Sequence, residues 1–201
     1  MPKLINSVAI LILASIFLLV SCSKVEKQAE KAPQKEEIKE NKNNSTTKKN
    51  LEKKEVVDTM IGKIAANIDL VDLDGNKTTL ETYKGKVIML NFWATWCGPC
   101  RAEIPDFIKM YEKHEKDGLV IVGISGFRED IESIKKYVSE NSMNYPILFV
   151  EKDAVETLVK NYGGIQGIPT TLLIDKKGVI RFKWVGPKSE EKFMEEVNKH
   201  L

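Results

Sequence analysis

The sequence predicts an α/β domain in which a central mixed β-sheet is flanked by helices. Residues 87–93 form a short, almost unbroken apolar run, the pattern of a strand buried on both faces of a sheet. A helical pattern with two cysteines at its start follows directly. Apolar strands and amphipathic helices then alternate until a final strand, turn, strand and helix. That order predicts a largely parallel sheet with an antiparallel end.

A β-hairpin is predicted before the buried strand. Residues 65–80 contain two short strand-like runs on either side of Asp74-Gly75-Asn76, a sequence that favours a tight turn. Residues 80–86, Leu-Glu-Thr-Tyr-Lys-Gly-Lys, lead from this hairpin into the strand. The domain is therefore expected to begin with an N-terminal β-hairpin extension.

The elements after the cysteines follow from hydrophobic periodicity and turn residues. The first helix should run to about His114 and end before Gly118, a typical helix C-cap residue. Apolar residues recur on one helical face within residues 129–140. The remaining predicted elements are strands 119–124 and 146–150, a helix over 153–161, a hairpin of strands 170–174 and 179–185 around Asp175–Gly178, and a closing helix over 189–200.

Cys97 and Cys100 are the candidate reactive residues. A thiol at a helix N-terminus meets unpaired backbone N–H groups and the positive end of the helix dipole, and both favour the thiolate. Cys97 is therefore predicted to be the nucleophile. Cys100, three residues along the helix, is placed to attack a mixed disulfide on Cys97, closing a Cys97–Cys100 disulfide and releasing the partner as a thiol.

Other uses of a Cys-x-x-Cys pair fit the sequence less well. A structural zinc site needs four ligands, two of which the cysteine pair could supply. The other candidates are Cys22, which the N-terminal motif described below assigns to a lipid, and the two histidines His114 and His200. Covalent haem attachment requires a histidine after the second cysteine, where Arg101 stands. A purely structural disulfide is an unusual use of a strand-to-helix turn. We therefore expect neither a metal nor a cofactor.

The active-site sequence carries a family resemblance. Trp96-Cys97-Gly98-Pro99-Cys100 after a buried strand resembles the active site of thioredoxin. The hairpin, residues 80–86 and the additional helix over 129–140 resemble the TlpA/ResA group of membrane-tethered thioredoxin-like proteins. The resemblance implies a thioredoxin fold with an N-terminal β-hairpin extension and an inserted helix, and thiol-disulfide oxidoreductase activity. Trp96 is expected to pack over Cys97, to limit solvent access to it and to help bind the substrate.

A second motif lies far along the chain, at Ile168-Pro169-Thr170 after a glycine-rich loop. Taken alone, Pro169 fits a proline at the start of a strand. The motif resembles the thioredoxin cis-proline, which implies a cis Ile168–Pro169 bond facing the cysteines. The backbone of Ile168 is then expected to bind an extended peptide.

The position of a carboxylate differs from that in thioredoxin. Thioredoxin carries a buried acid six residues before its first active-site cysteine, where this chain has Asn91, which does not titrate. Glu103 follows Cys100 by three residues and therefore lies on the same helix face. Its spacing also fits an ordinary first-turn carboxylate. The TlpA/ResA group carries Glu at this place, which implies that Glu103 is the proton acceptor.

The N-terminal region predicts export and attachment to a membrane. An apolar run over residues 4–20 ends in Leu19-Val20-Ser21-Cys22, which resembles the lipobox of bacterial lipoproteins. We expect a signal peptide over 1–21, a lipid on Cys22, a disordered Lys/Glu-rich tether over 22–57, and the thioredoxin-like domain over 58–201. The alternative is an uncleaved transmembrane anchor. Both place the domain on the extracytoplasmic face of a bacterial membrane.

The function predicted from the sequence is disulfide exchange with protein thiols. The formal net charge is +2, and Lys alternates with Glu, which argues against nucleic acid as a partner. The resemblance implies reduction of the haem-site cysteines of apocytochrome c to thiols before haem attachment, and a membrane electron donor such as a thiol-transferring transmembrane protein. We also expect a monomer. General disulfide reduction or oxidation is the first alternative. A peroxiredoxin-like peroxidase would need Thr and Pro where Ala94 and Leu90 stand, and a metal-binding lipoprotein would need His near the cysteines.

Overall fold

The computed structural model describes residues 58–201. The predicted signal peptide, the tether and the lipidated Cys22 lie outside the described residues. Within residues 58–201, none of the helices combines the length and the apolar character that crossing a bilayer requires.

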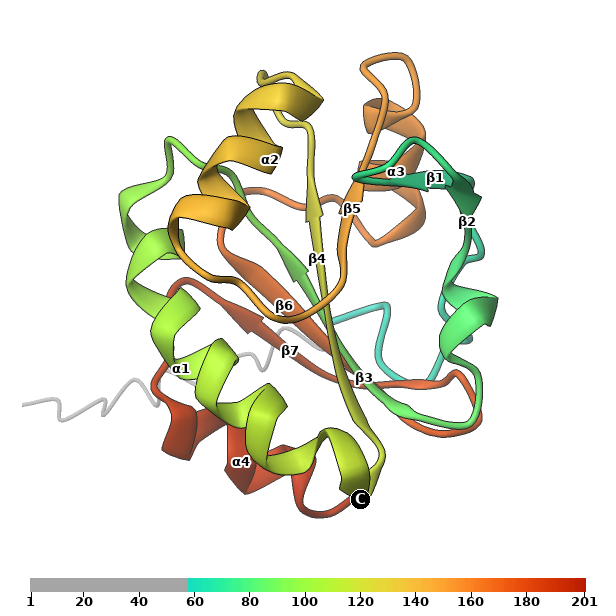
Figure 1. The fold of residues 1–201 in the computed structure, drawn as a ribbon. Helices are drawn as coiled ribbons and strands as arrows, with labels where there is room; N and C mark the ends of the chain where they lie inside the picture. The colour runs from blue at the N-terminus through green and yellow to red at the C-terminus, as the bar shows by residue number, and fades with distance from the viewer. Residues whose placement is uncertain (1–57) are drawn as a thin grey trace, which may run out of the picture. The chain divides into compact units, whose positions relative to one another are not determined.

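The core of the domain is a seven-stranded mixed sheet with the order β2-β1-β5-β4-β3-β6-β7 (Figure 1). The parallel pairs are β3 with β4 and β4 with β5, and the other neighbours are antiparallel. The central mixed sheet predicted from the sequence is therefore confirmed. The strands are β1 Leu70–Asp72, β2 Lys77–Thr78, β3 Val87–Phe92, β4 Leu119–Ser125, β5 Ile147–Phe149, β6 Thr170–Ile174 and β7 Ile180–Val185.

Helices cover both faces of the sheet, which accounts for the burial of every residue of β3. Met89 of β3 belongs to one hydrophobic cluster and Leu90 to the other, because successive strand residues point to opposite faces. The cluster of Met89 includes residues of α1, α2 and α4, and that of Leu90 includes α3 and the hairpin. The helices are α1 Gly98–His114, α2 Ile131–Glu140, α3 Val155–Asn161 and α4 Glu190–Val197, with short 3-10 turns at Leu80–Tyr83 and Glu115–Asp117 (Figure 1).

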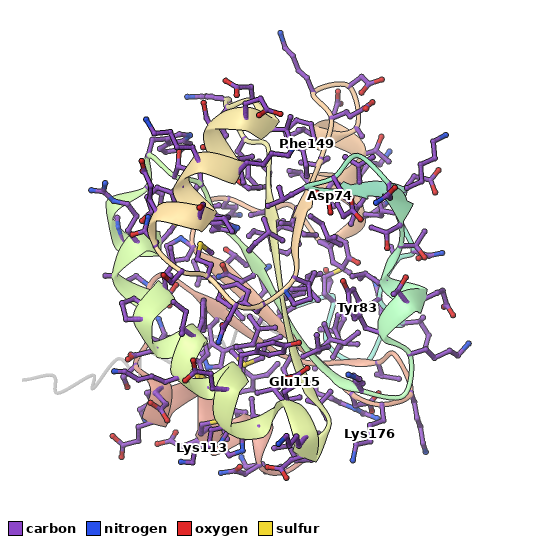
Figure 2. The ribbon with its side chains drawn as sticks, viewed as in Figure 1. Asp74, Tyr83, Lys113, Glu115, Phe149 and Lys176 are labelled. Carbon is purple, nitrogen blue, oxygen red and sulfur yellow. A yellow bond between two sulfur atoms is a disulfide. The ribbon has the colours of Figure 1, made fainter. Side chains whose placement is uncertain are left out.

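Charged side chains surround this core. Those of Lys113 and Lys176 lie at the outside of the fold, whereas the space between the sheet and α1 is filled by side chains (Figure 2). Phe107 of α1 and Phe193 of α4 meet there, with ring centroids 5.1 Å apart. This contact joins the helix that carries the cysteines to the C-terminal helix.

The inserted helix begins later than predicted. We expected it to start at Glu129, but α2 starts at Ile131 because Asp130 is its N-cap and accepts a hydrogen bond from the Ser133 N–H at 2.8 Å. Glu129 therefore lies in the loop between β4 and α2. Its carboxylate takes part in the contacts of the active-site loop described below.

Candidate active site

The cysteine pair lies where β3 passes into α1. A turn closed by the Cys97 N–H and the Ala94 carbonyl, 3.1 Å apart, brings the chain from the strand to the helix. Cys97 is the N-cap of α1, and its sulfur accepts a hydrogen bond from the Cys100 N–H at 3.2 Å. Pro99 occupies the first helical turn, where its missing N–H costs no helix bond. The predicted position of Cys97 at the helix terminus is confirmed.

The two sulfur atoms are joined as a Cys97–Cys100 disulfide. In this oxidised form the two residues differ little in exposure, at 5% for Cys97 and 2% for Cys100. The two cysteines therefore differ mainly in position, because Cys97 is the N-cap of α1 and Cys100 lies within the helix. Only Cys97 receives the backbone N–H bond that stabilises a thiolate there.

The second sequence motif faces the first. The Ile168–Pro169 bond is cis, as expected, and the carbonyl oxygen of Ile168 lies 3.7 Å from the sulfur of Cys97. The sheet brings these distant residues together because β6 pairs antiparallel with β3, with Thr170 opposite Phe92. The half-buried backbone of Ile168 therefore borders the disulfide, where an incoming polypeptide would meet it.

Trp96 forms an exposed rim beside the disulfide. The side chain is 55% exposed, and its indole N–H donates to the carbonyl of Phe127 at 2.9 Å. The ring is thus fixed against the loop that follows β4 and leaves an apolar surface open to a partner. Trp93 and Trp184 are buried in the core.

Asn91 is buried in place of the thioredoxin acid. Its amide donates to the hydroxyl of Thr171 at 2.9 Å, and the two residues are direct partners across β3 and β6. A neutral hydrogen-bonded pair therefore occupies this part of the core, and the candidate for proton transfer is on α1.

Glu103 is that candidate, and its side chain is only 2% exposed. One carboxylate oxygen accepts a hydrogen bond from the Lys188 N–H at 2.7 Å, and the other is buried with no partner among the described residues. Burial raises the pKa of Glu103 to about 7, and the charge of Asp106 adds to this, while the bond and charge of Lys188 act in the opposite direction. The alternative that Glu103 is a first-turn carboxylate is wrong, because α1 starts at Gly98 and has no acidic residue in its first turn. The burial and raised pKa of Glu103 favour the proton-acceptor interpretation.

Two contributors to the site were not predicted from the sequence. The backbone N–H of Lys188 binds Glu103 across 85 positions of sequence, and no local pattern indicates that contact. Glu129 binds the loop before Cys97, and in this case the sequence contains a signal that places Glu129 in a loop. The Asp130-x-x-Ser133 cap shows that the helix starts after Glu129 and leaves that residue in the loop.

A metal-binding role requires a cluster of metal-ligating side chains. Within residues 58–201, no three His, Cys, Asp or Glu side chains come together in a way that could hold a metal ion. His114 instead pairs with Asp117 at 3.2 Å.

A cysteine pair at a strand-to-helix junction, opposite a cis-proline on this fold, defines a thioredoxin-like thiol-disulfide oxidoreductase. Residues 61–183 match the AhpC/TSA family model. The chain belongs to that family and is a TlpA/ResA-type thiol-disulfide oxidoreductase.

The similarity to known relatives covers about two thirds of the chain. The chain is 35% identical over 139 residues to the thiol-disulfide oxidoreductase ResA of Bacillus thuringiensis subsp. konkukian, covering 69% of this chain and 78% of that protein. It is 30% identical over 138 residues to the thioredoxin-like protein YneN of Bacillus subtilis, covering 68% and 78%.

Solved structures agree with the fold. A thiol:disulfide interchange protein of Chlorobium tepidum TLS matches with a TM-score of 0.61 and 32% identity, covering 69% of this chain and 96% of that one. StoA of Bacillus subtilis matches with a TM-score of 0.54 and 28% identity, covering 66% and 96%.

Proposed function

We propose that this protein reduces disulfides of other proteins outside the cytoplasm, with Cys97 as the nucleophile, Cys100 as the resolving thiol and Glu103 as the proton acceptor. The observation that carries the proposal is the combination of a helix-capping Cys97 with a buried carboxylate, Glu103, one turn beyond Cys100. Protein thiols and disulfides are the substrates that the named relatives imply.

In the first step, the Cys97 thiolate attacks one sulfur of the partner's disulfide. The new Cys97–partner bond forms as the partner's S–S bond breaks, and one partner thiolate leaves and takes up a proton. The Cys100 N–H stabilises the Cys97 thiolate before attack. Trp96 and the backbone of Ile168 border the position that the partner polypeptide must occupy.

In the second step, Cys100 attacks the sulfur of Cys97 and releases the partner's second thiolate. Cys100 must first lose its proton, and burial of this thiol opposes ionisation. Glu103 accepts that proton, and a pKa of about 7 suits a base that works near neutral pH. Two electrons pass from the cysteine pair to the partner, and the pair ends as a disulfide.

The cellular setting that we propose follows from the N-terminal sequence and the family resemblance. Lipid on Cys22 anchors the domain to the membrane through residues 22–57. The substrate is a disulfide between the haem-site cysteines of apocytochrome c, which becomes two thiols before haem attachment. A thiol-transferring transmembrane protein then returns the Cys97–Cys100 pair to the reduced state. A general reductase or oxidase with the same site differs only in its partners and in the direction of electron flow.

The experiment that tests this function is partner trapping in cells. Replacing Cys100 by Ser stops the second step, so each partner stays bound to Cys97 as a mixed disulfide. Mass spectrometry of the trapped complexes should identify apocytochrome c. Trapping of many unrelated exported proteins would favour general disulfide reduction, and an absence of any trapped protein would contradict exchange through Cys97.

A further inference from the structure

The segment immediately before the nucleophile is held by one carboxylate from a distant part of the chain. Glu129 lies in the loop between β4 and α2, and it accepts hydrogen bonds from both the backbone N–H and the hydroxyl of Thr95. The N–H bond measures 3.1 Å to the nearer oxygen. Thr95 precedes Cys97 by two residues, so the contact lies next to the N-cap of α1.

The same carboxylate is also fixed to the sheet. Glu129 accepts a hydrogen bond from the hydroxyl of Ser125, the last residue of β4, which is fully buried. The Ser125 oxygen also lies 3.0 Å from the carbonyl of Trp93, the residue that follows β3. Glu129 therefore connects the Thr95 segment to the ends of two central parallel strands. Hydrogen bonds to an ionised carboxylate are stronger than those between neutral groups.

A second contact joins the same two loops. The indole N–H of Trp96 donates to the carbonyl of Phe127 at 2.9 Å, within the loop that carries Glu129. Arg128, which lies between Phe127 and Glu129 in the sequence, has a φ of 63°, a backbone conformation that is uncommon for a residue other than glycine. Uncommon backbone conformations persist where the surrounding contacts hold them, and they cluster at functional sites.

We infer that Glu129 is a positioning residue for the nucleophile, which holds Thr95 and thereby the approach of Cys97 to the partner's disulfide. Attack on a disulfide needs the thiolate in a defined direction relative to the S–S bond, and small displacements of a reacting group cost rate. Glu129 acts through Thr95 and takes no part in the bonds that form or break. The inference rests on the proposed role of Cys97 as nucleophile.

The test isolates the first step in the full domain with Cys100→Ser, where the mixed disulfide accumulates. Reduced protein is mixed with a disulfide peptide, quenched with acid and weighed by mass spectrometry. Glu129→Ala should slow formation of the mixed disulfide about tenfold. Glu129→Gln should recover to within about twofold of the parent, because its amide still accepts from Thr95 and donates to Ser125. Failure of the Cys100→Ser parent to react would count against the role of Cys97 rather than that of Glu129.

A matched control and a partner variant complete the test. Glu132 is exposed in the first turn of α2 and pairs with Lys135 at 3.2 Å, and Glu132→Ala should react as fast as the parent. Thr95→Val removes the hydroxyl and keeps the backbone N–H, so it should slow the first step on its own but add little to Glu129→Ala.

Two results would overturn the inference. One is an attack rate in Glu129→Ala equal to that of the parent. The other is independent, multiplicative effects of Thr95→Val and Glu129→Ala, since residues that act through one contact do not add. Should Glu129→Ala fail to fold, Thr95→Val decides alone, with slow attack at an unchanged unfolding midpoint supporting the inference and parental attack refuting it.

Discussion

Replacing Glu103 by Gln removes a buried base while keeping the shape of the side chain. The Gln oxygen retains the hydrogen bond from the Lys188 N–H, and the amide nitrogen replaces the carboxylate oxygen that has no partner. The fold and the first attack by Cys97 should therefore persist. The second step should slow, because Cys100 then has no carboxylate to take its proton.

The size of the effect follows from the pKa of Glu103. General base catalysis contributes about 10²- to 10⁴-fold, so resolution should slow at least about 100-fold at or below neutral pH. With a pKa of about 7, Glu103 is already ionised above that pH, and the rate of the parent should level off there. The Gln variant depends on ionisation of the thiol itself, so its rate should keep rising about tenfold per pH unit. The gap between the two proteins should close above pH 7.

The assay is stopped-flow reduction of a disulfide peptide between about pH 5 and pH 9, a range that spans the titration of Glu103 and the approach to thiol ionisation. Acid quench and mass spectrometry follow the mixed disulfide on Cys97. Glu112→Gln, an exposed change on the same helix, is the matched control and should behave as the parent.

Two outcomes would refute this reasoning. The parent could continue to rise through pH 7 without levelling, or Glu103→Gln could resolve the mixed disulfide as fast as the parent below neutral pH. In either case Glu103 would not be the proton acceptor for Cys100.

Further predictions concern stability and anchoring. Because the pKa of Glu103 is raised from 4.5 to about 7, the unfolded chain loses this proton first as pH rises. The free energy of unfolding therefore falls as the pH rises from 4.5 to about 7, by about 3 kcal/mol over the whole interval. In urea titrations, the free energy of unfolding of Glu103→Gln should equal that of the parent below about pH 4.5 and exceed it by up to about 3 kcal/mol above pH 7. Equal free energies of unfolding at every pH would contradict the raised pKa of Glu103. Gly126→Ala places a Cβ 2.3 Å from the Val150 carbonyl oxygen at a φ of 123°, and should lower the free energy of unfolding by at least about 1–3 kcal/mol. Gly164→Ala, where the added Cβ meets no neighbour, should cost less in the same urea titration, and equal losses would count against a steric clash. Cys22→Ser should abolish lipid incorporation measured with a labelled fatty acid, and undiminished labelling would exclude this residue as the anchor.

Much of the fold was predictable because local patterns determined it. The apolar run of β3, the turn residues around Asp74-Gly75-Asn76 and the glycine after the first helix each limit the chain to few conformations. The error at the start of α2 arose because periodicity alone extended the helix to Glu129. The N-cap Asp130 sets the boundary, and a cap is a stronger local signal than an additional polar residue on a helical face.

The site was predictable where chemistry follows from position along one helix. Cys97, Cys100 and Glu103 share α1, so their order and spacing indicated their arrangement. The bond from Lys188 to Glu103 joins a loop to α1, and the contact between Glu129 and Thr95 joins two loops at the strand ends. Sequence periodicity carries no information on such loop contacts, so their discovery required the three-dimensional structure.

The sharpest test of the whole account is the identity of the sulfur that carries the mixed disulfide. Reduced protein is mixed with a disulfide peptide and quenched with acid within milliseconds, and the modified cysteine is located by peptide mass spectrometry. We expect the peptide to be bound to Cys97 alone, Cys100→Ser to accumulate this species, and Cys97→Ser to form none at a comparable rate. A mixed disulfide found mainly on Cys100, or exchange that survives loss of Cys97, would contradict this expectation.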